Sequence, residues 1–223
     1  MVGPILYIAE VDYPAEHSAP HGKWNDWYAH RHAPDLFKLG ARSVSSYRSA
    51  VGGLAVLNVY EIPDAAVFST PAYKGMTPKD PYATETRELS AGKKRAQTLY
   101  LERAVLPADG QTIDADWISV LRFDLPESAD VALLDWLQGD ARKILVAHGV
   151  KHLRYGTRIA ENVGAGSFRP RCVIFAEWAV RPPEAADLLP GLARRFDAAV
   201  TGAENFIGWR AYPWPDAKRV GET

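Results

Sequence analysis

One segment near the N-terminus gathers most of the side chains that could carry out acid–base chemistry. If this segment is a helix, residues four apart share a face, so Trp24, Tyr28 and His32 form one stripe. Asp26 and His30 form a second stripe, where the carboxylate could stabilise a charged imidazole. Histidine ionises near neutral pH, which suits proton exchange with a substrate. The segment therefore supplies four candidate catalytic residues: His32, Tyr28, Asp26 and His30.

Both histidines also have non-catalytic interpretations. His30 could belong to a solvated ion pair on the surface, and His32 could be a structural histidine at the end of the helix. Pro34 lacks a backbone N–H, so we expect it to kink or end the helix just after His32. A helix C-terminus favours the charged form of a nearby histidine, which would suit a proton-exchanging role for His32.

The candidate helix lies in the first of two similar halves of the chain. A short apolar run at residues 5–11 is followed by an Asp-x-Pro turn, and a second run at residues 117–123 is followed by the same pattern. The length and composition of both runs predict buried strands. Each strand precedes a helical stretch, at about residues 23–39 in the first half and 128–148 in the second.

The remaining elements repeat in the same order. We expect further strands at residues 44–51, 56–63, 98–106, 152–159, 173–180 and 206–212. Each half then reads β-α-β-β-α-β, and the turn-forming stretch at residues 107–110 joins them. The sequence therefore predicts two ferredoxin-like units, at residues 1–106 and 111–213. In each, both helices cover one face of a four-stranded antiparallel sheet, and the tandem units form an α+β barrel.

Two such sheets can meet face to face, either within one chain or with a second chain in a homodimer. They could pack solidly or enclose a pocket for a small ligand, and we favour the pocket because the strands carry amphipathic aromatic residues. An arginine that points inward would have to be paired, or could bind a substrate carboxylate. The candidate substrate-binding residues are Trp24, Trp27, Tyr47, Tyr60, Arg48 and Trp178.

The composition excludes several classes of partner. With 26 basic against 27 acidic side chains, the chain has no excess positive charge for phosphate, so we expect no nucleic-acid partner. No segment approaches the roughly 18 apolar residues that span a bilayer, so we expect no membrane association. The N-terminus does not resemble a signal peptide. A single cysteine, Cys172, fits the reducing cytoplasm, and we expect it to pack rather than act as a nucleophile.

Cofactor motifs are absent from the sequence. It carries neither a phosphate-binding loop nor a dinucleotide-binding fingerprint. His30 and His32 would point to nearly opposite sides of a helix, so they could not bind one metal ion together. We therefore expect no cofactor and no metal, and a small-molecule substrate as the main partner.

The run from Trp27 to Pro34 resembles the W-Y-x-x-x-H-x-P signature of the EthD-like branch of the dimeric α+β barrel superfamily. The stretch at residues 69–73, followed by Thr77-Pro78 and a charged helix that ends before Tyr100, is similar to the second part of such domains. The resemblance covers residues 1–106. In the second half only the order of elements matches, and its helix offers Trp136 instead of the signature. Related sequences often carry acidic residues where this chain has Ala29, His30 and Arg31.

The resemblance implies a barrel of two ferredoxin-like units that houses cofactor-free chemistry on small cyclic or polyketide-like molecules. Carried over residue by residue, the signature corresponds to Trp27, Tyr28, His32 and Pro34, with His32 as the candidate acid or base. Our leading hypothesis is a cofactor-independent isomerase, lyase or cyclase acting on a small aromatic or lactone-like molecule. In it, His32 moves a proton, and Tyr28 or Asp26 orients the imidazole. The alternatives are a non-catalytic ligand-binding or dimerisation module and a haem-binding barrel, since one branch of the superfamily binds haem.

Overall fold

The computed structural model describes residues 4–12, 23–76, 94–107, 112–159, 169–196 and 199–213. Thr77-Pro78, the charged helix expected after it and most of the expected join at residues 107–110 lie outside this part of the chain. The exact boundary between the two units therefore stays a prediction.

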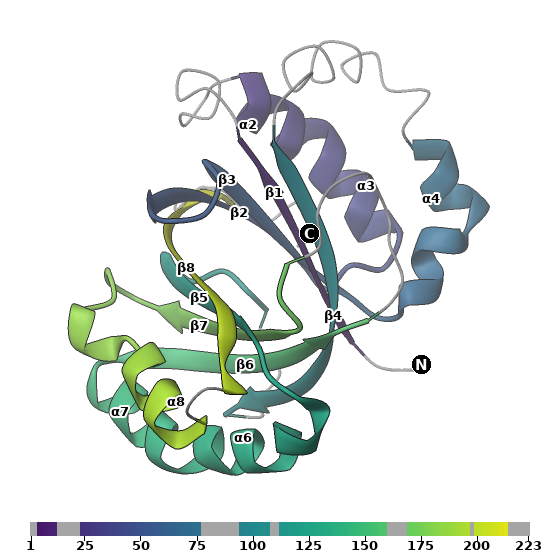
Figure 1. Ribbon diagram of the computed structural model, residues 1–223. Coiled ribbons are helices and arrows are strands. Elements are labelled where there is room, and N and C mark those ends of the chain that lie inside the picture. The colour runs from purple at the N-terminus through teal and green to yellow at the C-terminus, as the bar shows by residue number, and fades with distance from the viewer. Residues whose placement is uncertain are drawn as a thin grey trace.

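Eight antiparallel strands form a closed barrel in the order β1-β3-β2-β8-β5-β7-β6-β4 (Figure 1). The strands are β1 (Ile5–Val11), β2 (Ser43–Val51), β3 (Val56–Ile62), β4 (Arg95–Leu106), β5 (Trp117–Asp124), β6 (Val150–Arg158), β7 (Cys172–Trp178) and β8 (Thr201–Tyr212). The first four come from the first half of the chain and the last four from the second. Pairing of β2 with β8 and of β4 with β6 joins the halves, so the barrel closes within one chain. The predicted α+β barrel is confirmed.

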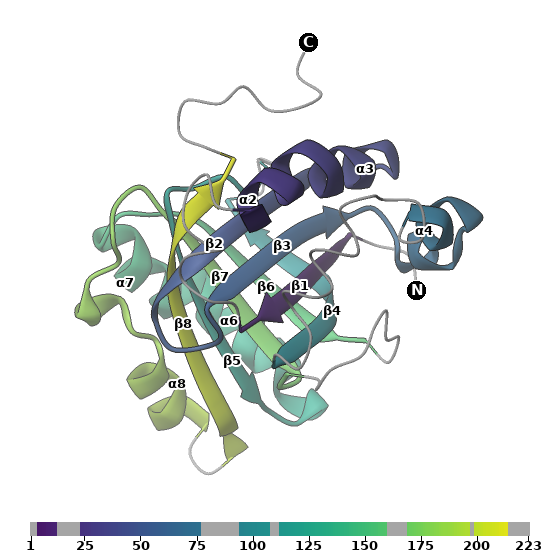
Figure 2. The ribbon, with the colours of Figure 1, turned by 90° about the horizontal axis from the view of Figure 1, so that it is seen from above.

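The helices of the two halves cover opposite sides of the barrel (Figures 1 and 2). The first half contributes α2 (Lys23–Trp27), the π-helical turn η1 (Tyr28–His32), α3 (Ala33–Lys38), the 3-10 turn η2 (Ala65–Ser69) and α4 (Pro71–Met76). The second half contributes η3 (Glu127–Ala129), α6 (Asp130–Trp136), the π-helical turn η4 (Leu137–Ala141), α7 (Arg142–Ala147), η5 (Glu184–Ala186) and α8 (Leu189–Phe196). Among the described helices, none has the length and apolarity needed to cross a bilayer.

Every strand side chain of β1 is buried, because one face of the strand meets the helices and the other faces the barrel interior. Tyr7 and Ala9 pack with the helices of the first half, whereas Leu6 and Ile8 belong to the cluster inside the barrel. Burial on both faces explains why the strand reads as a continuous apolar run rather than as an alternating pattern.

The barrel interior is filled by packed side chains where the described residues lie. Twelve buried hydrophobic residues from both halves form this inner cluster, with exposures of 0% or 1%. Tyr47 belongs to it, and its hydroxyl donates to the carbonyl oxygen of Ala115 at 3.1 Å. The expectation of a ligand chamber between the two sheets is therefore wrong for this region, because large side chains from both sheets occupy the space. The two candidate sites described below lie on the outer faces of the sheets.

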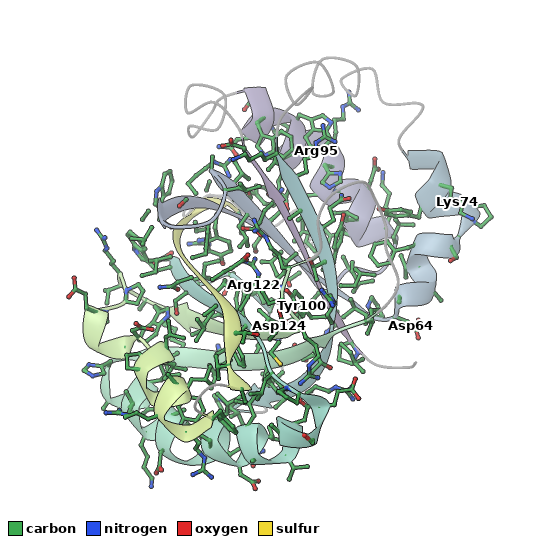
Figure 3. All side chains as sticks on the ribbon, in the orientation of Figure 1. Asp64, Lys74, Arg95, Tyr100, Arg122 and Asp124 are labelled. Atoms are coloured by element: carbon green, nitrogen blue, oxygen red, sulfur yellow. The ribbon has the colours of Figure 1, made fainter. Side chains whose placement is uncertain are left out.

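Buried ion pairs flank this apolar centre. Toward one end, Arg122 lies 3.1 Å from Glu10, which Arg169 also contacts at 2.8 Å, and Figure 3 places Arg122 beside Tyr100 within the barrel. The other group is built on Arg154, whose guanidinium contacts three glutamates described below. Arg154 is thus an inward-pointing arginine, and it is paired as such a residue must be.

Candidate functional site

A cluster of aromatic side chains lies between the outer face of the first sheet and the helix that runs from α2 to α3. The rings of Tyr7 and Tyr60, on neighbouring strands, have centroids 5.0 Å apart. Tyr28 lies 6.4 Å from Tyr60. We call this group the aromatic cluster; its members are Tyr7, Trp24, Trp27, Tyr28, His32, Tyr60, Phe68, Tyr73 and Tyr212.

His32 enters this cluster through a π-helical turn. The helix widens over Tyr28–His32, and the Ala33 amide donates to the Tyr28 carbonyl five residues earlier. A wide turn of this kind brings His32 and Tyr28 to one side of the helix, with ring centroids 5.5 Å apart. Such turns occur often at functional sites.

The sequence predicts that Pro34 kinks or ends the helix, and the structure shows that it does not end it. After the π-helical turn the chain continues as α3 to Lys38, and Pro34 occupies the first turn of that segment. Pro34 cannot donate a backbone hydrogen bond to the turn before it, and the wide π-helical turn over Tyr28–His32 interrupts the regular helical hydrogen bonds just ahead of it. His32 consequently lies within the helix, so the dipole of a helix C-terminus does not favour its charged form as expected.

The imidazole of His32 is held by one hydrogen bond and one stacking contact. Its Nε2 lies 3.3 Å from the hydroxyl of Tyr60. The ring stacks on Trp27 with centroids 4.7 Å apart and an angle of 20° between the planes. His32 is only half-buried, so part of its side chain faces solvent while the cluster fixes its orientation.

The phenols around His32 stay protonated at neutral pH. Burial raises the pKa of Tyr28 and of Tyr60 above the usual value for tyrosine. The neighbouring Tyr60 adds to the rise at Tyr28, whereas the hydrogen bond with Tyr28 opposes the rise at Tyr60. Burial also raises the pKa of Tyr7, and the amide of Gln97 donates to its hydroxyl at 2.8 Å. The cluster therefore combines neutral hydrogen-bond donors with one side chain that can exchange a proton near pH 7.

Arg48 supplies a buried positive charge close to this cluster. It lies on the helix-facing side of β2 with 4% of its surface exposed, and its guanidinium donates to the side chains of Asn25 and Ser46. Burial lowers the pKa of Arg48 to about 10, and the interaction with Tyr28 opposes that shift. At neutral pH Arg48 remains charged, so it favours negative charge that develops near Tyr28.

The structure separates the remaining candidates from this cluster. Asp26 and His30 are exposed on the solvent side of the helix, because the wide turn directs Tyr28 and His32 inward instead. Tyr47 faces the barrel interior, on the opposite side of the sheet. Trp178 lies in the second half, where its indole N–H donates to Ser119 at 3.0 Å. The structure brings together the other candidates: His32, Tyr28, Trp24, Trp27, Tyr60 and Arg48.

Several members of the cluster were not among the candidates. Tyr7 reaches it from β1, where Gln97 of β4 donates to its hydroxyl, and Phe68 and Tyr73 reach it from η2 and α4. Tyr7 could have been found, because it alternates with the inward-facing Leu6 and Ile8. The others depend on strand pairing and on chain packing, which leave no local signal.

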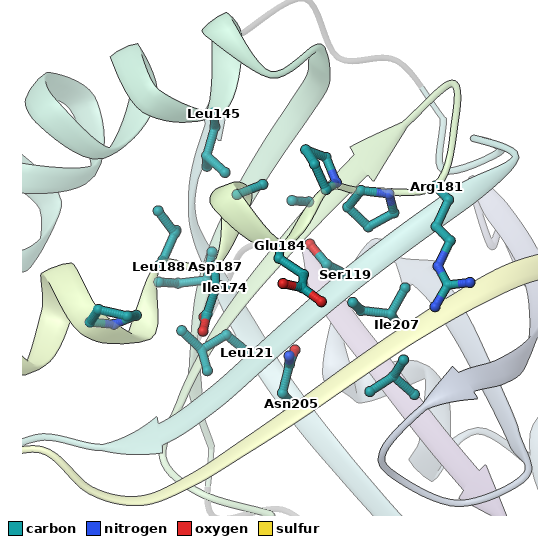
Figure 4. Close-up of a pocket in the computed structure, with 16 residues that line it drawn as sticks. Ser119, Leu121, Leu145, Ile174, Arg181, Glu184, Asp187, Leu188, Asn205 and Ile207 are labelled. Atoms are coloured by element: carbon teal, nitrogen blue, oxygen red, sulfur yellow. The ribbon is translucent and has the colours of Figure 1, made fainter.

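A pocket of about 920 Å³ lies on the outer face of the second sheet, beneath the segment at residues 181–190 (Figure 4). Haem iron needs an axial ligand such as His, Cys, Met or Tyr. None of the residues that line this pocket is of these types, so the pocket does not fit haem. In the aromatic cluster, the Nε2 atom of His32 is engaged with Tyr60. Among the described residues, no three His, Cys, Asp or Glu side chains gather as a metal site.

Comparison with solved structures shows the fold. An anthrone oxidase-like protein aligns with a TM-score of 0.58 and 13% identity over 99% of this chain and 95% of that one. A monooxygenase-like protein from Listeria innocua aligns with a TM-score of 0.51 and 8% identity, over 97% and 96%. A haem-binding protein from Thermus thermophilus aligns with a TM-score of 0.51 and 11% identity, over 94% of this chain and 92% of the other. The chain has the ferredoxin-like α+β barrel fold. No protein-family model and no curated protein matches the sequence.

Proposed function

We propose that this protein is an enzyme that transfers a proton on a small cyclic, aromatic or lactone-like molecule without a cofactor, in an isomerase, lyase or cyclase reaction. The observation that carries the proposal is the pair formed by His32 Nε2 and the Tyr60 hydroxyl, 3.3 Å apart at the edge of the aromatic cluster. A proton-exchanging group is thus held against neutral phenol donors and flat apolar rings.

The proposed step is removal of a proton from a carbon next to a carbonyl group. His32 accepts the proton at Nε2 once the Tyr60 hydroxyl turns to the substrate oxygen, and the electron pair of the C–H bond moves onto that oxygen. The Tyr60 hydroxyl stabilises the resulting enolate more than the neutral ketone, which lowers the barrier. Arg48 favours the same negative charge from beneath Tyr28. Return of the proton to a different atom completes an isomerisation.

Two further observations support the class of substrate. The residues of the EthD-like signature, Trp27, Tyr28 and His32, lie together in the structure, which supports our proposal that the chain is related to that branch. A protein of the same fold is named for an anthrone oxidase, and anthrone is a fused-ring ketone. A flat ring system matches the stacked rings of Trp27 and His32.

The test is exchange of carbon-bound hydrogen for deuterium, followed by NMR in D₂O with anthrone and with an unsaturated five-membered lactone as probes. We expect the wild-type protein to accelerate exchange and His32→Ala to lose at least about 100-fold of that acceleration. His148→Ala, which removes an exposed histidine in the second half, is the matched control and should keep full activity. Equal exchange rates for wild type and His32→Ala at equal melting temperature would exclude His32 as the base, and no acceleration of either probe would contradict the proposal.

A further inference from the structure

The pocket in the second half occupies the position that corresponds to the aromatic cluster in the first half. In the first half Tyr7 on β1 pairs with Tyr60 on β3, and in the second half the matching pair on β5 and β7 is Ser119 and Ala176. Both Ser119 and Ala176 line the pocket. Small side chains thus stand where the first half has two phenol rings, and the space that they leave is the pocket.

The helix above the sheet also carries a smaller side chain in the second half than in the first. Both halves contain a five-residue π-helical turn between two α-helical segments, Tyr28–His32 in η1 and Leu137–Ala141 in η4. The turn ends at His32 in the first half and at Ala141 in the second. The second half therefore keeps the backbone geometry of the site but has no proton-exchanging side chain at the corresponding position.

We infer that this second-half pocket is a separate, non-catalytic binding site for an uncharged, mostly apolar ring molecule that carries a carbonyl oxygen. Its volume of about 920 Å³ suits a ligand of two or three fused rings. Its floor consists of two rows across neighbouring strands, Ala176-Ser119-Ile207 and Ile174-Leu121-Asn205. The floor therefore combines an apolar surface with two uncharged polar groups.

Ser119 explains why the ligand should carry a carbonyl oxygen. Its hydroxyl oxygen accepts the indole N–H of Trp178 at 3.0 Å, which leaves the hydroxyl hydrogen to be donated. Ser119 is only partly buried and lies in the middle of the floor (Figure 4). A ligand oxygen that accepts this hydrogen would be fixed at the centre of the pocket.

The charged residues of the pocket lie at its exposed rim and argue against a charged ligand. Arg181 is held over the ring of Trp117, 5.9 Å from its centroid, whereas Glu184 and Asp187 carry the opposite charge nearby. Together, Arg181, Glu184 and Asp187 carry a net negative charge, so the rim does not attract an anion. The floor has no charged side chain that could pair with a cation. Prolines 182, 183 and 190 fix the backbone of the segment above the floor, which favours a preformed pocket.

The test uses 6-propionyl-2-(dimethylamino)naphthalene, an uncharged two-ring ketone whose fluorescence shifts to the blue when it leaves water. We expect saturable binding to wild type and at least a tenfold weaker affinity for Ile207→Trp, which fills the floor. Val131→Trp places the same side chain on the exposed surface of α6 and should bind as wild type does. His32→Ala should also keep full affinity, because the pocket is independent of the aromatic cluster. Affinity that is unchanged in Ile207→Trp, or lost in His32→Ala, would overturn the inference.

A second measurement tests the hydrogen bond from Ser119 and does not depend on how the Ile207 variant folds. The competitors are 2-acetonaphthone, a ketone, and 2-ethylnaphthalene, which has nearly the same shape without the oxygen. We expect wild type to bind the ketone about tenfold more tightly and Ser119→Ala to lose this preference. The preference is a ratio measured within one variant, so any loss of stability at Trp178 does not affect it. An equal preference in both proteins, or none in wild type, would contradict the inference.

Discussion

The ion cluster around Arg154 makes the stability of this protein depend on pH in a defined direction. The guanidinium contacts Glu61 at 3.2 Å, Glu102 at 3.0 Å and Glu177 at 3.0 Å, and all three carboxylates are nearly or fully buried. Arg42 adds a second positive charge 3.8 Å from Glu61. Three carboxylates thus share two guanidiniums, and burial raises the pKa of Glu177 to about 7 despite the opposing effect of Arg154.

The sign of the effect follows from proton binding. Below pH 4.5 Glu177 is protonated in both the folded and the unfolded protein, so its contribution to stability is fully present. Between pH 4.5 and about 7 the unfolded chain has released this proton and the folded protein has not, so the free energy of unfolding falls as the pH rises. A pKa raised from 4.5 to about 7 corresponds to roughly 3 kcal/mol, and the loss is complete above that range.

Glu177→Gln tests this directly, because glutamine resembles the protonated acid and cannot ionise. We expect the variant to match wild type at pH 4.5 and to exceed it at pH 8 by up to about 3 kcal/mol, or about 1–2 M in the urea midpoint. Urea unfolding between pH 4.5 and 8 measures the difference. His152 is buried opposite Glu177 in the β6–β7 register. It is unchanged in the variant, so its contribution largely cancels from the difference between the two free energies of unfolding. Glu184→Gln, at an exposed position, is the matched control. A constant difference across this pH range would refute the reasoning.

Three further substitutions probe the site and the barrel. Tyr60→Phe removes the hydroxyl that contacts His32 and should lower the exchange activity by about 10- to 100-fold with little change in melting temperature; an unchanged rate would exclude this phenol from the reaction. Gly156→Ala would place a Cβ 3.0 Å from that of Tyr100 inside the barrel and should cost about 1–3 kcal/mol in urea unfolding, whereas no cost would show that the interior can relax. Asn25→Ala removes an acceptor of the buried Arg48 and should cost about 1–3 kcal/mol, and the conservative Asn25→Asp should recover part of it.

Local patterns in the sequence were sufficient to predict most of the framework. Strand β1 has the predicted bounds, and β5 ends one residue later than expected. These strands are buried on both faces, so each stands out as an apolar run between turn residues. The π-helical turn left no such signal, because its geometry is fixed by how the helix packs on the sheet. Of the kink or end that Pro34 predicted, the helix end is not found, and the helix runs on to Lys38 after an irregular turn.

The candidate site was predictable only where its members are close in sequence. Trp27, Tyr28 and His32 belong to one helix, and their spacing alone predicts that they lie together. Tyr7 joins them only through the register of β1 with β3. The second-half pocket was not predictable, because it results from small residues such as Ala176. Ala176 leaves space only by comparison with Tyr60, which occupies the matching position of the first half.

The inner face of the barrel shows why one chain can carry two halves with different chemistry. Glu10 on β1 and Arg122 on β5 occupy matching positions, and they meet as an ion pair at 3.1 Å. In a barrel of two identical units, two residues of the same charge would meet at this position. Their repulsion would destabilise the fold, because the position is buried. Glu61 and Glu177 also match, and both are held by Arg154, which only one half supplies. The interior thus requires two different halves, whereas each outer face packs with its own helices. The presence of Ala141 at the position that matches His32 is therefore compatible with closure of the barrel.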